Sequence, residues 1–131
     1  MKIIRILFLV LMSQSLMLSC KKDDVKLNEN QDNLIGNWIN PEYTDSLIIL
    51  EKSGTLKLNE YGISFKADGK LIERKINGWC GTPPVVYSDY EGSWTKQDSL
   101  ISIEVGYWGG TSTYKWIIIS MAGNKLKVKK E

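Results

Sequence analysis

The sequence contains no histidine, and this absence restricts its chemistry more than any other feature of its composition. Histidine is the usual proton shuttle near neutral pH, the common base beside a nucleophilic serine or cysteine, and a frequent zinc ligand. Catalytic triads and dyads based on histidine are therefore excluded, as are histidine metal sites. We predict that the protein is not an enzyme and that it uses no metal and no cofactor.

An excess of charge of one sign is also lacking. The chain has 17 basic and 15 acidic residues. Lys2 and Arg5 lie in an N-terminal segment that we predict to be removed, which leaves 15 basic residues against 15 acidic ones. Nucleic-acid binding requires a basic stripe that displaces counterions. We predict no nucleic-acid partner.

The N-terminal apolar run is shorter than the roughly 20 residues that a membrane-spanning helix needs. It extends from Ile6 to Met12, and the polar segment Ser13-Gln14-Ser15 interrupts it. Lys2 and Arg5 precede it as a positively charged region, which is the pattern of an export signal. We predict that residues 1–19 are a signal peptide.

The residues that follow carry a family resemblance. Leu16-Met17-Leu18-Ser19-Cys20 resembles a bacterial lipobox, in which a small residue precedes the cysteine that receives the lipid. Lys21-Lys22-Asp23-Asp24 resembles the export signal of surface-exposed lipoproteins of the Bacteroidota. The resemblance implies a mature chain that begins at an acylated, for example palmitoylated, Cys20. It also implies an outer-membrane location, on the cell surface or alternatively on the periplasmic face. Two or three acyl chains on Cys20 would hold the protein firmly in the membrane.

Residues 21–33 have only Val25 and Leu27 as apolar side chains and show no periodicity. Such a composition predicts a flexible tether of about 20 Å rather than a folded segment. We therefore divide the chain into a signal peptide (1–19), a lipidated cysteine with its tether (20–33) and one domain (34–131). The length leaves room for only one core.

From residue 34 onward, short apolar runs alternate with Gly, Asp, Asn and Ser, as is typical of consecutive antiparallel strands. Asp68-Gly69 is the strongest hairpin signal, because these residues tolerate positive φ. No segment shows a helical period over ten or more residues. The predicted strands are Leu34–Ile39, Ser46–Lys52, Thr55–Asn59, Gly62–Ala67, Lys70–Asn77, Tyr90–Lys96, Leu100–Val105, Ser112–Ser120 and Lys125–Lys129.

So many short strands must close into a barrel or pack as two sheets, because open edges promote aggregation. Gly36-x-Trp38 resembles the Gly-x-Trp of the first lipocalin strand, where the tryptophan closes one end of the barrel. The region from Leu34 to Lys129 resembles the lipocalin-like domains of Bacteroidota lipoproteins. We predict an all-β, antiparallel, up-and-down, lipocalin-like barrel of about eight or nine strands.

The long break in the strand pattern, from Asn77 to Asp89, is a candidate functional loop. It contains Trp79, Cys80 and Tyr87. An acylated Cys20 would leave Cys80 without a partner in the chain. Burial of Cys80 in the core is the simpler interpretation, because a catalytic thiolate needs a neighbouring base or cation.

Candidate ligand-binding residues are mostly aromatic. Those in loops either surround the opening of the barrel or cap its ends, whereas those within strands fit the core or a cavity lining. The candidates for the opening are Trp79, Tyr87, Trp94 and Trp108, and Trp94 also belongs, with Tyr114 and Trp116, to the group within strands.

Arg74 is the remaining candidate. It lies between Ile72 and Ile76 on one face of its strand, so it either points inward toward a ligand carboxylate or lies outside and pairs with an acidic residue. The other polar candidates are Glu73, Asp89, Glu91 and Glu104.

Two functions remain open at this point. The first is binding of a small apolar or amphipathic ligand inside the barrel. The alternative is a cell-surface module with a packed barrel that binds a glycan or a protein through its loops. A hydrolase that uses two carboxylates is a weaker third possibility, because sequence spacing does not fix the separation such chemistry needs.

Overall fold

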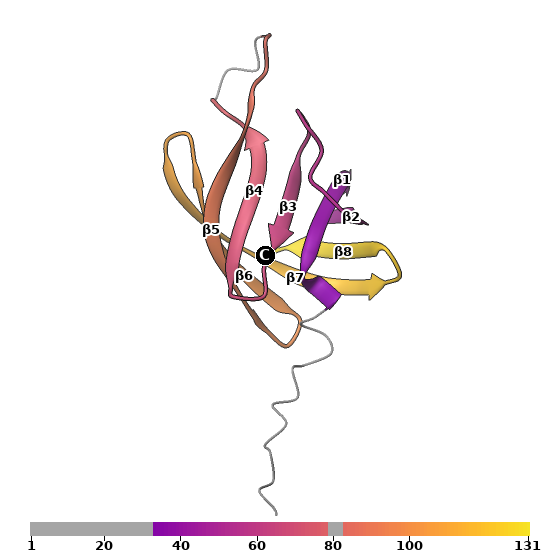
Figure 1. Cartoon of the computed structure of the whole chain (residues 1–131). Coiled ribbons are helices and arrows are strands. Elements are labelled where there is room, and N and C mark those ends of the chain that lie inside the picture. The colour runs from indigo at the N-terminus through magenta and orange to yellow at the C-terminus, as the bar shows by residue number, and fades with distance from the viewer. Residues whose placement is uncertain (1–32, 79–82) are drawn as a thin grey trace, which may run out of the picture.

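The computed structural model describes residues 33–78 and 83–131, and these form a closed barrel of eight antiparallel strands (Figure 1). The predicted all-β, up-and-down, lipocalin-like barrel is confirmed in this eight-stranded form. No helix in the described ranges is long and apolar enough to cross a membrane. The strands are β1 (Gly36–Thr44), β2 (Leu47–Ser53), β3 (Gly62–Phe65), β4 (Lys70–Ile76), β5 (Tyr87–Gln97), β6 (Leu100–Tyr107), β7 (Gly110–Ala122) and β8 (Lys125–Lys130).

The strand order explains how the barrel closes. From β3 to β8 each strand pairs with the next one in the chain, and β8 then pairs with β2. β1 lies between β2 and β3 and is antiparallel to both. The connection from β2 to β3, residues 54–61, must therefore pass across β1. We call this segment the crossover.

The predicted strand over Thr55–Asn59 is wrong, because these residues belong to the crossover. Leu56 gives this segment the alternation of apolar and polar residues that is typical of a strand. Its side chain and that of Ile39 both lie against Gly62, where a Cβ atom would come within 2.7 Å of Leu56 and 3.3 Å of Ile39. Leu56 thus covers the outer surface of the barrel, and apolar packing from outside gives the same sequence pattern as a strand.

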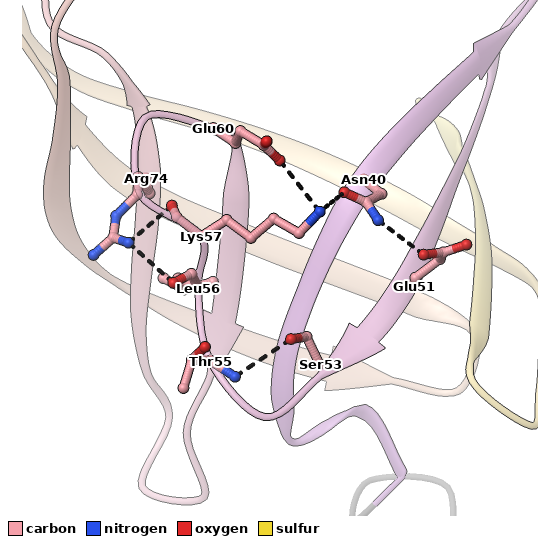
Figure 2. Close-up of polar contacts among 8 residues, drawn as sticks. All are labelled: Asn40, Glu51, Ser53, Thr55, Leu56, Lys57, Glu60 and Arg74. Atoms are coloured by element: carbon pink, nitrogen blue, oxygen red, sulfur yellow. Dashed lines mark hydrogen bonds and ion pairs between the residues drawn. The ribbon is translucent and has the colours of Figure 1, made fainter.

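Polar contacts fasten the crossover to the strands on both sides (Figure 2). Arg74 of β4 donates from Nη1 to the carbonyl oxygens of Leu56 (3.3 Å) and Lys57 (3.0 Å). Lys57 Nζ donates to Oδ1 of Asn40 (2.9 Å), and Asn40 Nδ2 donates to Oε2 of Glu51 on β2 (2.9 Å). Asn40 has a φ of 52° within the β-bulge of β1.

Trp38 lies near the start of β1, at the end of the barrel that we call the closed end. It is fully buried, and its indole nitrogen donates to the carbonyl oxygen of Leu34 (2.8 Å). The ammonium group of Lys52 lies 5.4 Å from the centre of the Trp38 ring and donates to the carbonyl oxygen of Asn33 (3.2 Å). The chain therefore enters the barrel at this closed end, close to the β3–β4 and β5–β6 hairpins (Figure 1).

Buried side chains fill much of the barrel interior. Phe65 packs edge-on against Trp94 and Trp116, with ring centres 5.3 Å and 6.5 Å apart. Such edge-to-face pairs stabilise a core beyond the area they bury. Besides Trp38, the other members of this core are aliphatic residues from five strands and from the segment before β1: Leu34, Ile48, Leu50, Ile63, Leu71, Ile101, Ile103, Val105, Leu126 and Val128.

The close approach of β5 and β6 leads to a stability prediction. A Cβ atom on Gly92 would clash with the backbone oxygen of Glu104 and lie 2.7 Å from Cα of Val105. Gly92→Ala should therefore lower the free energy of unfolding by about 1–3 kcal/mol, measured by urea denaturation. Gly106→Ala is the matched control, because its Cβ would have its nearest neighbour at 3.6 Å. Equal stability of the two variants would contradict the prediction.

Candidate ligand-binding site

A pocket of about 260 Å³ enters the barrel at the end opposite Trp38, next to the β1–β2 hairpin and the end of β8. We call it the chamber. Its lining is mainly aromatic and charged, and it consists of Tyr43, Ile48, Tyr61, Glu73, Tyr114, Lys115, Trp116, Lys130 and Glu131.

The wall of the barrel is incomplete beside the chamber, because β3 is only four residues long. β3 pairs with β1 only up to Ile39 and with β4 only up to Arg74. Beyond these residues β1 and β4 continue without a strand between them. A second pocket of about 570 Å³ occupies this position, and we call it the side opening. It is lined by Pro41, Tyr43, Glu60, Tyr61, Lys75, Ile76 and Tyr87, so it shares Tyr43 and Tyr61 with the chamber.

Glu73 is the central polar group of the chamber and is only 5% exposed. Its Oε1 accepts hydrogen bonds from the hydroxyl groups of Tyr61 (2.8 Å) and Tyr114 (3.0 Å). Its Oε2 accepts one from Lys75 Nζ (2.7 Å). A buried charge is tolerated when it is paired and hydrogen-bonded, and this carboxylate meets both conditions.

The tyrosines around Glu73 are held in their protonated form. Burial raises the pKa of Tyr61 well above its ordinary value, and the negative charge of Glu73 raises it further. The pKa of Tyr114 is raised by the same two causes in the same order. These hydroxyl groups therefore act near neutral pH as hydrogen-bond donors and not as bases.

Trp116 lines the chamber and lies at its boundary with the core. It is 2% exposed, and its ring is tilted against that of Tyr114 with centres 5.6 Å apart. Its buried indole N–H has no acceptor among residues 33–78 and 83–131. This N–H is therefore an unpaired donor enclosed by the packed interior of the described residues, and it is not exposed to the chamber.

The arrangement suits non-covalent binding. Aromatic side chains provide apolar contact area, and a few fixed polar groups provide orientation, as in other small-molecule sites. Within the described ranges, no group of three or more His, Cys, Asp or Glu side chains is placed to hold a metal ion.

The loop aromatics predicted from the sequence occupy different parts of the molecule. Tyr87 lines the side opening. Trp108 lies in the β6–β7 hairpin, where it is 52% exposed and packs edge-on against Tyr107, with ring centres 5.9 Å apart. It lines neither the chamber nor the side opening. Trp79 falls outside the described residues, as does Cys80.

The predicted position of Trp94 near the opening is wrong. Its indole nitrogen donates to the carbonyl oxygen of Lys66 (3.0 Å) in the β3–β4 hairpin, which lies at the closed end. Its ring is buried against Phe65. The apolar alternation of β5 indicates that Trp94 faces the interior, but it does not indicate at which height along the barrel.

Arg74 lies on the outer face of β4, which is one of the two positions left open by the sequence. Its guanidinium group donates to both carboxylate oxygens of Asp89 on β5, at 2.6 Å and 2.9 Å. The inward face of β4 carries Leu71, Glu73 and Lys75 instead. The strand therefore turns two charged side chains inward and leaves Ile76 partly exposed.

The pair of Arg74 and Asp89 predicts a loss of stability in acid. The hydrogen bonds from Arg74 lower the pKa of Asp89 below its ordinary value of 3.8. A lowered pKa in the folded state stabilises the protein above the unfolded-state value, and this contribution is lost as the pH falls through the folded-state value. Asp89→Asn should therefore flatten the decline of stability below about pH 4, measured by urea denaturation across pH. A parallel decline in wild type and variant would contradict this.

Sequence reasoning missed several residues of the two pockets, notably Tyr43 and Tyr61, which line both, and Lys75, which lines the side opening. The inward position of Lys75 could have been predicted from that of Glu73, because residues two positions apart in a strand point to the same face. Tyr61 precedes β3 and reaches Glu73 only through the path of the crossover. Tyr114 and Trp116 do lie where a cavity lining was one of the predicted alternatives.

The fold and the chamber define a class: a small closed β-barrel with an aromatic and polar pocket at one end. Comparisons with protein-family models, with curated proteins and with solved structures find no match. The residues of the predicted anchor, Cys20 and Lys21, Lys22, Asp23 and Asp24, lie outside the described ranges.

Proposed function

We propose that the protein is a membrane-anchored lipoprotein whose barrel binds a small apolar or amphipathic molecule in the chamber, without catalysis. One observation carries the ligand-binding part: the chamber adjoins the side opening and shares Tyr43 and Tyr61 with it, so the interior has an entrance. The anchoring part rests on the resemblance of residues 16–24 to a lipobox followed by a surface-export signal.

The composition and size of the two pockets support an amphipathic ligand. Small-molecule sites typically have volumes of about 300–1,000 Å³ and combine apolar walls with a few placed polar groups. The side opening presents Tyr43 and Ile76, which are 64% and 41% exposed, whereas the chamber presents the buried cluster around Glu73. An apolar segment of the ligand would fit the side opening, and its polar end would fit the chamber.

The binding test is a thermal-shift and calorimetric screen with fatty acids, sterols and porphyrins. We expect at least one class to raise the melting temperature, since a ligand that binds only the folded state stabilises it. Tyr43→Ala should weaken that binding, and Trp108→Ala should leave it unchanged because Trp108 lines neither pocket. A screen in which no class binds would contradict the proposal.

The second candidate function is recognition of a glycan or a protein at the cell surface. The exposed pair of Tyr107 and Trp108 favours it, because flat aromatic faces stack on sugar rings and contact proteins. Binding that Trp108→Ala abolishes and Tyr43→Ala preserves would favour this function over the first.

The anchor is tested separately. Cys20→Ala should move the protein from the membrane fraction to the soluble fraction, and continued retention in the membrane would contradict lipidation. Proteinase treatment of intact cells then separates the two proposed locations at the outer membrane. Digestion of the domain supports the cell surface, and protection supports the periplasmic face.

A further inference from the structure

Lys130 is a cation in the lining of the chamber to which no ion pair is assigned. It is the last residue of β8 and shares its strand face with Leu126 and Val128, which are fully buried, so its side chain points into the barrel. It lines the chamber and is exposed there. Within residues 33–78 and 83–131, none of the ion pairs involves its ammonium group. The described part of the protein therefore leaves this charge accessible to a bound molecule.

The other charges around the chamber balance one another. The carboxylate of Glu73 pairs with Lys75, and its two oxygen atoms accept three hydrogen bonds in all, from Tyr61, Tyr114 and Lys75. Lys115 and Glu131 carry opposite charges. Both also line a further pocket formed by β5, β6 and β7. Among the residues that line the chamber, Lys130 is therefore the charge in excess, and it is positive.

The two pockets provide room for an apolar chain whose polar end lies at Lys130. The chamber and the side opening share Tyr43 and Tyr61, so they form one path. This path begins at Lys130 and ends at Ile76, which lines the side opening and is 41% exposed. Small-molecule sites combine such apolar contact area with one or a few polar groups that fix the orientation of the ligand. Lys130 is placed to be that group.

We propose that the chamber binds an amphiphile with a carboxylate head group, and that this carboxylate pairs with the ammonium group of Lys130. Hydrogen bonds between two charged groups are about twice as strong as those between neutral ones, so the pairing favours an ionised head group. The apolar chain passes Tyr43 and Tyr61 and reaches Ile76. This inference rests on the proposed function and adds the charge of the ligand and the residue that holds its polar end.

The first test compares three probes with chains of matched length, which are octanoate, octylammonium and octanol. Calorimetric titration of the full chain at neutral pH measures the three affinities. Octanoate should bind about ten-fold tighter than octylammonium, a ratio that corresponds to ~1.4 kcal/mol. Octanol is the reference for the apolar contacts, because it has the same chain and no charge. Equal or tighter binding of octylammonium would overturn the assignment of an anionic ligand.

The second test reverses the charge at Lys130. Lys130→Glu should make octylammonium the tighter of the two charged probes and leave the affinity for octanol within about two-fold. Lys129→Glu is the matched control, because it makes the same change of charge one residue away, on the opposite face of β8, and Lys129 lines neither pocket. This variant should keep the preference for octanoate. If the two variants changed the preference equally, a long-range charge effect would explain it and the assignment of Lys130 would be overturned.

Lys130→Met keeps the inference testable if Lys130→Glu does not fold, which a lowered melting temperature and loss of binding of all three probes would reveal. Methionine removes the charge and keeps most of the apolar stem. It should weaken octanoate binding about three- to ten-fold, in the range for loss of a charged hydrogen bond or an ion pair. Its affinity for octanol should stay unchanged. Unchanged octanoate binding in this variant would overturn the inference.

The outcomes separate this inference from the function on which it rests. If none of the three probes binds the wild-type protein and the wider ligand screen also finds nothing, the proposed function fails together with the inference. If octanol binds but replacement of Lys130 has no effect on octanoate, the protein remains a ligand-binding barrel and only the assignment of the polar end is overturned.

Discussion

Trp38→Ala should lower the free energy of unfolding by about 3–5 kcal/mol, the usual cost of removing a large aromatic side chain from a core. Trp38 is fully buried and is among the largest fully buried side chains of the described residues. Its removal also leaves the carbonyl oxygen of Leu34 without its indole donor. Both losses fall at the point where the chain enters the barrel, so the closed end should open first.

Urea denaturation followed by circular dichroism measures this loss, and Trp38→Phe is the matched control. Phenylalanine keeps an aromatic ring in the site and removes the hydrogen bond, so it should cost clearly less than alanine. A loss below about 1 kcal/mol for Trp38→Ala would place the residue among ordinary surface substitutions and contradict its role in closing the barrel.

Glu73→Leu should destabilise the protein by about 2–4 kcal/mol, because it leaves two tyrosine hydroxyl groups and one ammonium group without their shared acceptor. Removing one partner of a fully buried ion pair would lower the free energy of unfolding by more than this amount. Lys75 moderates the effect, since its side chain is 22% exposed and can turn toward water.

A double variant provides the control for Glu73. Replacing a whole buried ion pair with apolar residues is often close to neutral, whereas removing one partner is not. Glu73→Leu combined with Lys75→Met should therefore be more stable than Glu73→Leu alone. If the double variant lost the sum of the two single losses, the contact between Glu73 and Lys75 would contribute nothing to folding.

Much of the fold could be predicted from the sequence because strands leave a local signature. Alternation with a period of two placed eight of the nine predicted strands at or near their observed positions, and Asp68-Gly69 marked a turn in which Gly69 has a φ of 80°. The error over Thr55–Asn59 has the same origin. Leu56 packs on the outside of β1, and alternation does not distinguish the two sides of a barrel wall.

The candidate site could not be predicted in the same way, because its contacts are not local. Tyr114 and Glu73 are 41 residues apart in sequence and meet only across the barrel interior. Their distance depends on the tilt of the strands and on the short length of β3, which no single segment encodes. The strand pattern placed Trp94 and Trp116 in the core or in a cavity lining, but it did not indicate that Trp94 lies at the closed end and Trp116 beside the chamber.

The entry of the chain beside Trp38 has a consequence for the direction in which cargo travels. A lipid on Cys20 would join the membrane, through the predicted tether, to the closed end of the barrel. The chamber would then lie at the end of the barrel farther from the point of attachment, and a ligand would enter or leave it without passing the tether.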